Sequence, residues 1–216
     1  MFGVGVHERD MEPMMPEYPQ PTDDPFARSR GLLESIITDL DSAATAGLTH
    51  AQIEDELTTR GRQLQRSLLQ DHLDLRALRE ADHHDVIGAD QTRRTRAEKG
   101  RRRTLSTVFG QVSVERKAYR APGVANLHPA DAALSLPVER HSHGLRRLAA
   151  LESTRGSFQD AAQAITRATG VPIGKRQVEE LAARAALDVA DFYEARERTT
   201  CAEGDVLVIS ADGRAS

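Results

Sequence analysis

The sequence predicts a mainly α-helical chain that is interrupted by one β-hairpin. Leucine and isoleucine recur at intervals of three and four residues through 27–80, and a similar spacing of apolar residues returns through 143–198. This spacing is absent from 86–122, where two segments rich in β-branched residues flank Gly110. We therefore expect two helical regions on either side of a short antiparallel ribbon.

Composition limits the classes of protein that the chain can belong to. Hydrophobic residues make up 39% of the 216 residues, enough to build a buried core without disulfide bonds. Cys201 is the single cysteine, which excludes an internal disulfide framework and a multi-cysteine zinc site. The sequence has neither a signal peptide nor an apolar run long enough to span a membrane, so we expect a cytoplasmic protein with no membrane partner.

The net charge of −4 conceals a strong separation of charge along the chain. Residues 1–91 carry 8 Lys and Arg against 18 Asp and Glu, whereas residues 92–120 carry 10 Lys and Arg against 2 Asp and Glu. One concentrated basic block thus lies within an acidic background. Such blocks are typical of surfaces that contact nucleic acid, although charge alone is an unspecific signal.

Proline and leucine patterns organise the N-terminal part of the chain. Residues 1–25 hold five prolines among acidic side chains, and we expect them to form a disordered leader. Residues 26–85 predict a helical hairpin, with a first helix from Ala27 to about Leu40. The second helix is expected to start at a capping box between Thr49 and Gln52 and to run to about residue 80.

Residues 86–122 form the predicted basic β-hairpin. Its strands are expected at 102–108 and 112–119, with Gly110 supplying the positive φ of the turn. The cations that precede and enter the hairpin are candidate contacts for successive phosphates: Arg93, Arg94, Arg96, Lys99, Arg101, Arg102 and Arg103. The alternative is a solvated ribbon whose charges are paired within the protein with those of the acidic helices.

Residues 123–200 predict a helical region that resembles a helix-turn-helix unit. A short helix follows Ser142, and the next opens with a capping box at Ser157 and closes at Gly170. A final helix is expected to continue to about Arg198. Its first residues would be placed to reach DNA bases and phosphates, and they are Lys175, Arg176 and Gln177. The alternative is a plain helical hairpin with a charged end.

Residues 201–216 have a different character. The run 206–210, Val-Leu-Val-Ile-Ser, is typical of a strand that is buried on both faces, and Asp212 follows it directly. Acidic residues at the ends of such strands often bind metals or act in catalysis. Taken alone, however, an Asp-Gly pair is more often a simple turn.

Three segments together resemble the N-terminal half of the ISKra-type insertion-sequence transposases of bacteria. They are TLSTVFGQVSVERKAYRAPG, then the long run from NLHPADAALSLP through SFQDAAQAITRATGVPIGKRQVEELAARAA, and finally GDVLVISADG. The resemblance covers about 26–213. It implies an RNase H-like catalytic domain whose first strand is 206–210, with Asp212 as the first of three catalytic carboxylates that bind Mg²⁺.

The resemblance also contains a departure. Family members continue past this Asp-Gly with Lys-Gly and a long catalytic domain, whereas this sequence ends with Arg-Ala-Ser at 214–216. One carboxylate cannot hold the two metal ions of such a site. We therefore expect a truncated catalytic domain, with no bound Mg²⁺ and no strand cleavage by this chain alone.

The expected function is recognition of transposon-end DNA by the N-terminal part of a transposase. The basic ribbon would contact the backbone, and the helix-turn-helix-like region would read bases. The alternative is a non-catalytic protein that dimerises, with itself or with a full-length transposase, through its leucine-rich helices and modulates the intact enzyme.

Overall fold

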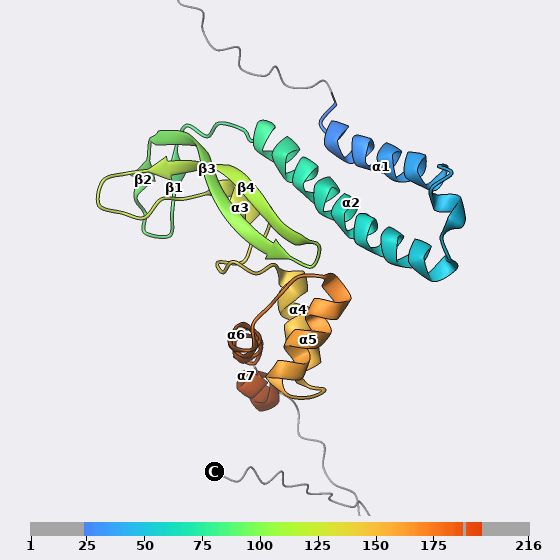
Figure 1. Cartoon of the computed structure of the whole chain (residues 1–216). Helices are drawn as coiled ribbons and strands as arrows, with labels where there is room; N and C mark the ends of the chain where they lie inside the picture. The colour runs from blue at the N-terminus through green and yellow to red at the C-terminus, as the bar shows by residue number, and fades with distance from the viewer. Residues whose placement is uncertain (1–23, 188, 196–216) are drawn as a thin grey trace, which may run out of the picture.

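The computed structural model describes residues 24–187 and 189–195. The predicted leader up to residue 23, Cys201, the predicted strand 206–210 and Asp212 lie outside the described residues. Within these residues the protein is mainly helical, with two small antiparallel sheets (Figure 1). The expectation of a mainly α-helical chain with a β-hairpin is confirmed at this level.

The N-terminal helical hairpin is present. Helix α1 (Ala27–Leu40) is followed by the short 3₁₀ helix η1 (Thr45–Gly47) and the long helix α2 (His50–Leu78). The capping box at Thr49 forms as predicted, with the Thr49 hydroxyl accepting from the Gln52 backbone N–H. A buried polar contact joins the two helices, because Asp71 accepts hydrogen bonds from the Ser29 hydroxyl at 2.5 Å and from its backbone N–H at 3.1 Å.

The predicted β-hairpin is also present, with longer strands than the sequence indicated. Strands β3 (Arg96–Thr107) and β4 (Gly110–Arg120) pair around a two-residue turn. Gly110 has φ +117°, as the turn requires. The pairing register shifts between Glu98 and Arg101. Strand β3 begins before this irregularity, at Arg96, whereas the predicted strand began after it, at residue 102.

Helix α2 covers the outer edge of β4. The Gln70 side chain accepts a hydrogen bond from the Ser113 backbone N–H at 2.8 Å and donates one to the Ser113 carbonyl at 2.9 Å. Further along, Glu80 accepts from the Lys117 N–H at 2.8 Å. These bonds satisfy backbone groups that an edge strand would otherwise expose, and they fix the ribbon against α2.

A small apolar core lies beneath the ribbon. Leu73 from α2 packs with three buried ribbon residues, namely Leu105, Val112 and Val114. Helix α3 (Pro129–Ala133) lies on the same ribbon, where Asp131 Oδ1 is 2.7 Å from Arg116 Nε. The sequence pattern predicted the first helix of residues 123–200 only after Ser142.

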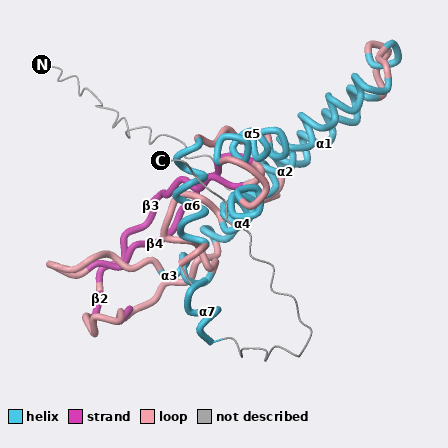
Figure 2. Tube along the Cα trace, turned by 90° about the horizontal axis from the view of Figure 1, so that it is seen from below, coloured by secondary structure: helices cyan, strands magenta, loops and turns pink. Residues whose placement is uncertain are grey.

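A second small sheet joins the far end of the ribbon. Strands β1 (Val86–Ile87) and β2 (Arg93–Arg94) are antiparallel. In Figures 1 and 2 this end of the ribbon extends from one side of the molecule, and the α1–α2 hairpin extends from the other. The sequence pattern did not predict this sheet, since two-residue strands leave no periodicity.

The C-terminal helices form a separate packed unit. Helices α4 (His143–Ser153), α5 (Phe158–Thr169) and α6 (Lys175–Ala185) enclose one hydrophobic core. Its buried residues are Leu145, Ala149, Ala161, Ala162, Ile165, Ile173, Val178 and Leu181. The three predicted local signals are confirmed: Ser142 caps α4, Ser157 and Asp160 form a capping box, and Gly170 ends α5 at φ +70°.

The prediction of one final helix running to about Arg198 is wrong. Helix α6 ends at Ala185, and a separate helix α7 (Val189–Ala195) follows. Beyond Leu181 the residues of α6 contribute nothing to the three-helix core, and Leu187 is exposed. The core packing that supports an amphipathic helix therefore ends at Leu181, well before the predicted end of the helix near residue 198.

No helix of the described ranges is long and apolar enough to cross a membrane.

Candidate nucleic-acid interface

Three of the predicted phosphate contacts are exposed but already paired with carboxylates of the ribbon region. Arg93 makes two hydrogen bonds of 2.5 Å to Asp85. Arg102 Nε lies 2.8 Å from Glu115, although its side chain remains 73% exposed. These contacts support part of the alternative interpretation, in which the ribbon charges are balanced within the protein, but the acids come mainly from the ribbon region and not from the helical hairpin.

Arg101 belongs to a shared ion cluster. Glu98 lies 2.8 Å from both Arg101 and Arg120, and these hydrogen bonds to the two guanidinium groups lower the pKa of Glu98. Both arginines are about half exposed. One carboxylate therefore faces two guanidinium groups, so the cluster keeps a net positive charge towards solvent.

Arg94 has a structural position instead of a surface one. Its side chain is 2% exposed, and its guanidinium donates to both carboxylate oxygens of Asp90, to the carbonyl of Thr92 and to the carbonyl of Ala125. These hydrogen bonds hold the pKa of Asp90 at about 2, with the Arg94 contact as the main cause and the Thr92 backbone N–H as the next. The guanidinium is therefore not presented to a phosphate here.

Arg103 is likewise directed inward. Its guanidinium donates to the carbonyls of Pro137, Val138 and Glu139, in the segment that leads to α4. Its side chain is mostly buried, and a further contact of 3.7 Å reaches Asp131. Arg103 thus connects the ribbon to the three-helix unit.

Arg96 and Lys99 are exposed and, among the described residues, make no hydrogen bond or ion pair. They lie at the start of β3, where Arg96 precedes Glu98 of the Arg101–Glu98–Arg120 cluster by two residues and Lys99 lies between Glu98 and Arg101. A phosphate could approach both without breaking an existing contact.

The start of α6 presents two cations. Lys175 and Arg176 are exposed at the first turn, and Arg176 makes a weak i,i+4 pair of 3.2 Å with Glu180 while remaining 90% exposed. Gln177 is already occupied, since its side chain accepts the backbone N–H of Gly174 at 3.0 Å. Lys175 is the residue of this trio whose side chain makes no hydrogen bond or ion pair among the described residues, and Arg176 stays accessible because its pair with Glu180 leaves it 90% exposed.

The three-helix unit has some features of a helix-turn-helix and lacks others. Helices α5 and α6 are adjacent and share a core with α4. The connecting segment 170–174 is longer than the turn of roughly three to four residues that is typical of such motifs. Glu179 and Glu180 also lie on the exposed face of α6, and the further cation of this helix, Arg184 in its last turn, is paired with Glu139.

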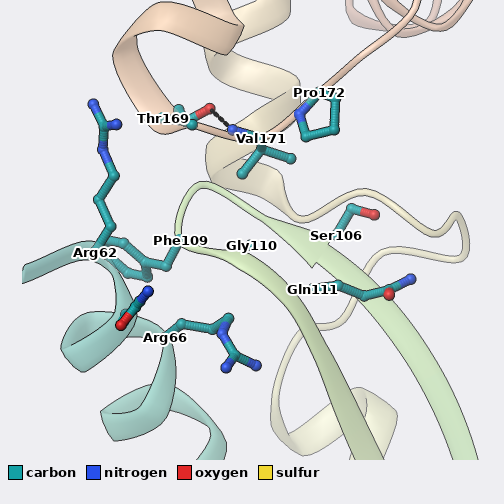
Figure 3. Close-up of a pocket in the computed structure, with 11 residues that line it drawn as sticks. Arg62, Arg66, Ser106, Phe109, Gly110, Gln111, Thr169, Val171 and Pro172 are labelled. Carbon is teal, nitrogen blue, oxygen red and sulfur yellow. Dashed lines mark hydrogen bonds between the residues drawn. The ribbon is translucent and has the colours of Figure 1, made fainter. Parts of the chain in front are cut away.

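Two basic residues that sequence reasoning missed lie close to this region. Arg62 and Arg66 of α2 line a hollow together with the ribbon turn and residues 169–172, which connect α5 to α6 (Figure 3). The sequence pattern did not predict this arrangement, because these arginines are more than 100 residues away from Gly170 in the chain. Their i,i+4 spacing on one helix face was the only available signal.

The structure does not test the predicted metal site. Asp212 lies outside the described residues, and within those residues no group of three or more His, Cys, Asp or Glu side chains is arranged to hold a metal ion. The roles of Asp212 as catalytic acid and Mg²⁺ ligand stay predictions.

Comparison of the chain with protein-family models, with curated proteins and with solved structures finds no match.

Proposed function

We propose that this chain is the DNA-binding part of an ISKra-type transposase and that it recognises the ends of the transposon. The observation that carries the proposal is the first turn of α6. Lys175 and Arg176 are exposed there, while Val178 and Leu181 on the other face are buried in the three-helix core. A rigid helix that projects cations from its N-terminus is suited to DNA contact.

The ribbon supplies the second part of the proposed interface. After Arg94 and Arg103 are set aside as structural residues, the predicted phosphate contacts that remain exposed are Arg93, Arg96, Lys99, Arg101 and Arg102. Three of these are paired with carboxylates, which DNA phosphates would have to displace or bridge. We therefore assign backbone affinity mainly to Arg96, Lys99 and the Arg101–Arg120 cluster.

Base readout and backbone affinity are separable by mutation. The double variant Lys175→Ala/Arg176→Ala should lose most of the preference for a terminal-repeat duplex over a shuffled duplex, because side chains that reach base edges carry sequence discrimination of about 1–3 kcal/mol each. The variant Arg96→Gln/Lys99→Gln should lower the binding affinity for both duplexes by the same factor. Fluorescence anisotropy with both duplexes measures the two effects.

Two results would contradict the proposal. The first is an intact chain that binds neither duplex at low salt. The second is a Lys175→Ala/Arg176→Ala variant that still prefers the terminal-repeat duplex over the shuffled duplex as strongly as the intact chain does. This result would mean that α6 does not read bases. Gln163→Ala, an exposed change on α5, is the control for nonspecific effects.

A second candidate function is self-association through the helical hairpin. Large apolar residues of α1 and α2 remain substantially exposed, in particular Leu33, Ile37, Leu40 and Leu57. Leu33, Ile37 and Leu40 recur at intervals of four and three residues, which places them along one face of α1. Such a face is suited to packing against another helical hairpin.

Sedimentation or light scattering of the intact chain tests this second candidate. A dimer that dissociates in the variant Leu33→Ser/Ile37→Ser would support it, with Thr38→Ser as the control on the same helix. A monomer at concentrations well above those of the DNA-binding assay would exclude it, without affecting the proposed DNA contacts.

A further inference from the structure

A hollow of about 360 Å³ lies where three elements meet, between α2, the turn of the β3–β4 ribbon and the segment after α5. Figure 3 shows Arg62 rising from α2 beside Phe109 towards the end of α5, and Arg66 lying below Gly110. The hollow is therefore formed only when the helical hairpin, the ribbon and the three-helix unit are assembled.

The charge in this hollow is entirely positive. Arg62 and Arg66 line it, and no Asp or Glu is among its lining residues in the described chain. The exposed ribbon arginines Arg93, Arg101 and Arg102, by contrast, each contact a carboxylate. An anion entering the hollow would meet cations without first displacing an acidic side chain.

Arg62 is held in place by the end of α5. Its Nη2 donates to the carbonyls of Arg167 and Ala168, at 3.1 and 3.2 Å. Its Nε and Nη1 make no hydrogen bond within the described residues. Arg62 thus has a fixed position and keeps donors that a ligand could use.

Arg66 lies one helical turn further along α2 and is exposed, with no hydrogen bond or ion pair among the described residues. Its stem is confined by the ribbon, since a Cβ added to Gly110 would lie only 3.0 Å from Arg66 Cδ. Neutral donors also line the hollow, namely the amides of Gln63 and Gln111 and the hydroxyl of Ser106, beside the apolar side chains of Phe109, Val171 and Pro172. Two guanidinium groups and several neutral donors form a set that matches the oxygens of a phosphate.

We propose that this hollow binds a phosphate group of the DNA backbone. The inference rests on the proposed function and extends it, because it makes α2 a part of the DNA interface. Lys175 follows the lining residue Pro172 by three positions, so at most about 11 Å of chain separates the edge of the hollow from the end of α6 that is proposed to read bases. Such a contact would fix the orientation of α6 on the duplex.

The first experiment measures duplex DNA binding by Arg66→Gln in the intact chain. Removal of one phosphate contact should weaken both the terminal-repeat and the shuffled duplex about tenfold and lower the salt slope by about one unit. The control is Arg76→Gln, an exposed arginine on the same helix that is not part of the hollow. Equal affinities for the two variants would overturn the inference while leaving the proposed function intact.

The second experiment tests the hollow without DNA. The NMR signals of the Arg62 and Arg66 Nε–H groups are followed during titration with inorganic phosphate, with chloride at matched ionic strength as the reference. Both signals should move with phosphate and not with chloride, and Arg66→Gln should abolish the movement of Arg62. An unchanged pair of signals would overturn the inference even if DNA binds elsewhere.

The two experiments also separate failure of the inference from failure of the proposed function. An intact chain that binds phosphate in the hollow but no duplex DNA would overturn DNA as the source of the phosphate and the proposed function with it. The intact chain could instead bind an RNA duplex of the same length more tightly than DNA. If Arg66→Gln also weakened that RNA binding, RNA would replace DNA as the ligand of the hollow.

Discussion

At the scale of single residues, the ribbon arginines divide into two kinds that look identical in sequence. Arg94 and Arg103 are surrounded by carbonyl and carboxylate oxygens and connect distant segments, whereas Arg96 and Arg102 extend to solvent. Asp90 is only four residues from Arg94, but other partners of these two arginines, such as Ala125 and Glu139, lie 31 and 36 positions away. A dense run of cations therefore overestimates the number of charges available to DNA.

The Asp90–Arg94 contact gives the fold a defined dependence on acid. The pKa of Asp90 is about 2 in the folded protein, below its ordinary value of 3.8. A carboxyl group with a lowered pKa stabilises the fold fully above its ordinary pKa, and this contribution is lost as the pH falls through the folded value. The contact should thus be at full strength at neutral pH and weaken between about pH 4 and pH 2.

Asp90→Asn should remove this dependence. Urea denaturation should show wild type more stable than Asp90→Asn by a constant margin from pH 7 to about pH 5, with the margin shrinking towards pH 2. Asp55→Asn, an exposed change on α2, is the control. A margin that stayed constant down to pH 2 would mean that Asp90 does not stabilise Arg94 as a carboxylate.

At the scale of secondary-structure elements, local signals predicted the helices well. The Thr49 and Ser157 capping boxes and the left-handed Gly170 were readable because each acts within about four residues of itself. The positive φ of Gly110 was readable for the same reason. The β1–β2 sheet, the short α3 and the break after α6 were missed because tertiary contacts decide them.

The candidate site was less predictable than the fold. Lys175 and Arg176 were identified from sequence because they begin a helix, and the structure places both at the surface. Arg62 and Arg66 were not identified, since their environment is created by the ribbon turn and the segment after α5. Gln177 was identified as a reader of bases, but its side chain hydrogen bonds the N-terminal end of its own helix.

Removal of the N-cap of α5 tests how much the capping box stabilises this helix of the three-helix unit. Ser157→Ala should reduce the free energy of unfolding by about 1 kcal/mol, because the Asp160 N–H loses its acceptor and the Asp160 carboxylate loses the hydroxyl donor. Thermal denaturation measures the change, with the exposed Gln159→Ala on the same helix as control. If Ser157→Ala reduced the free energy of unfolding only as much as Gln159→Ala does, the capping box would not stabilise α5.

At the scale of the whole molecule, the fold connects its three parts through polar contacts as well as small cores. Gln70 and Glu80 bind α2 to the edge of β4, Arg103 binds the ribbon to the segment before α4, and Arg62 binds α2 to the end of α5. These contacts bring basic residues from α2 close to the connection between α5 and α6. The proposed DNA interface is therefore a property of the assembled chain and not of the basic block alone.

The salt dependence of DNA binding by the intact chain is the decisive measurement for the proposed recognition of transposon ends. Association constants for a terminal-repeat duplex and a shuffled duplex are measured by fluorescence anisotropy over a range of salt concentrations. We expect tighter binding of the terminal repeat at every concentration, with log K falling linearly with log salt by about 0.9 for each phosphate contacted. Absence of binding at low salt, or binding that does not change with salt, would contradict it.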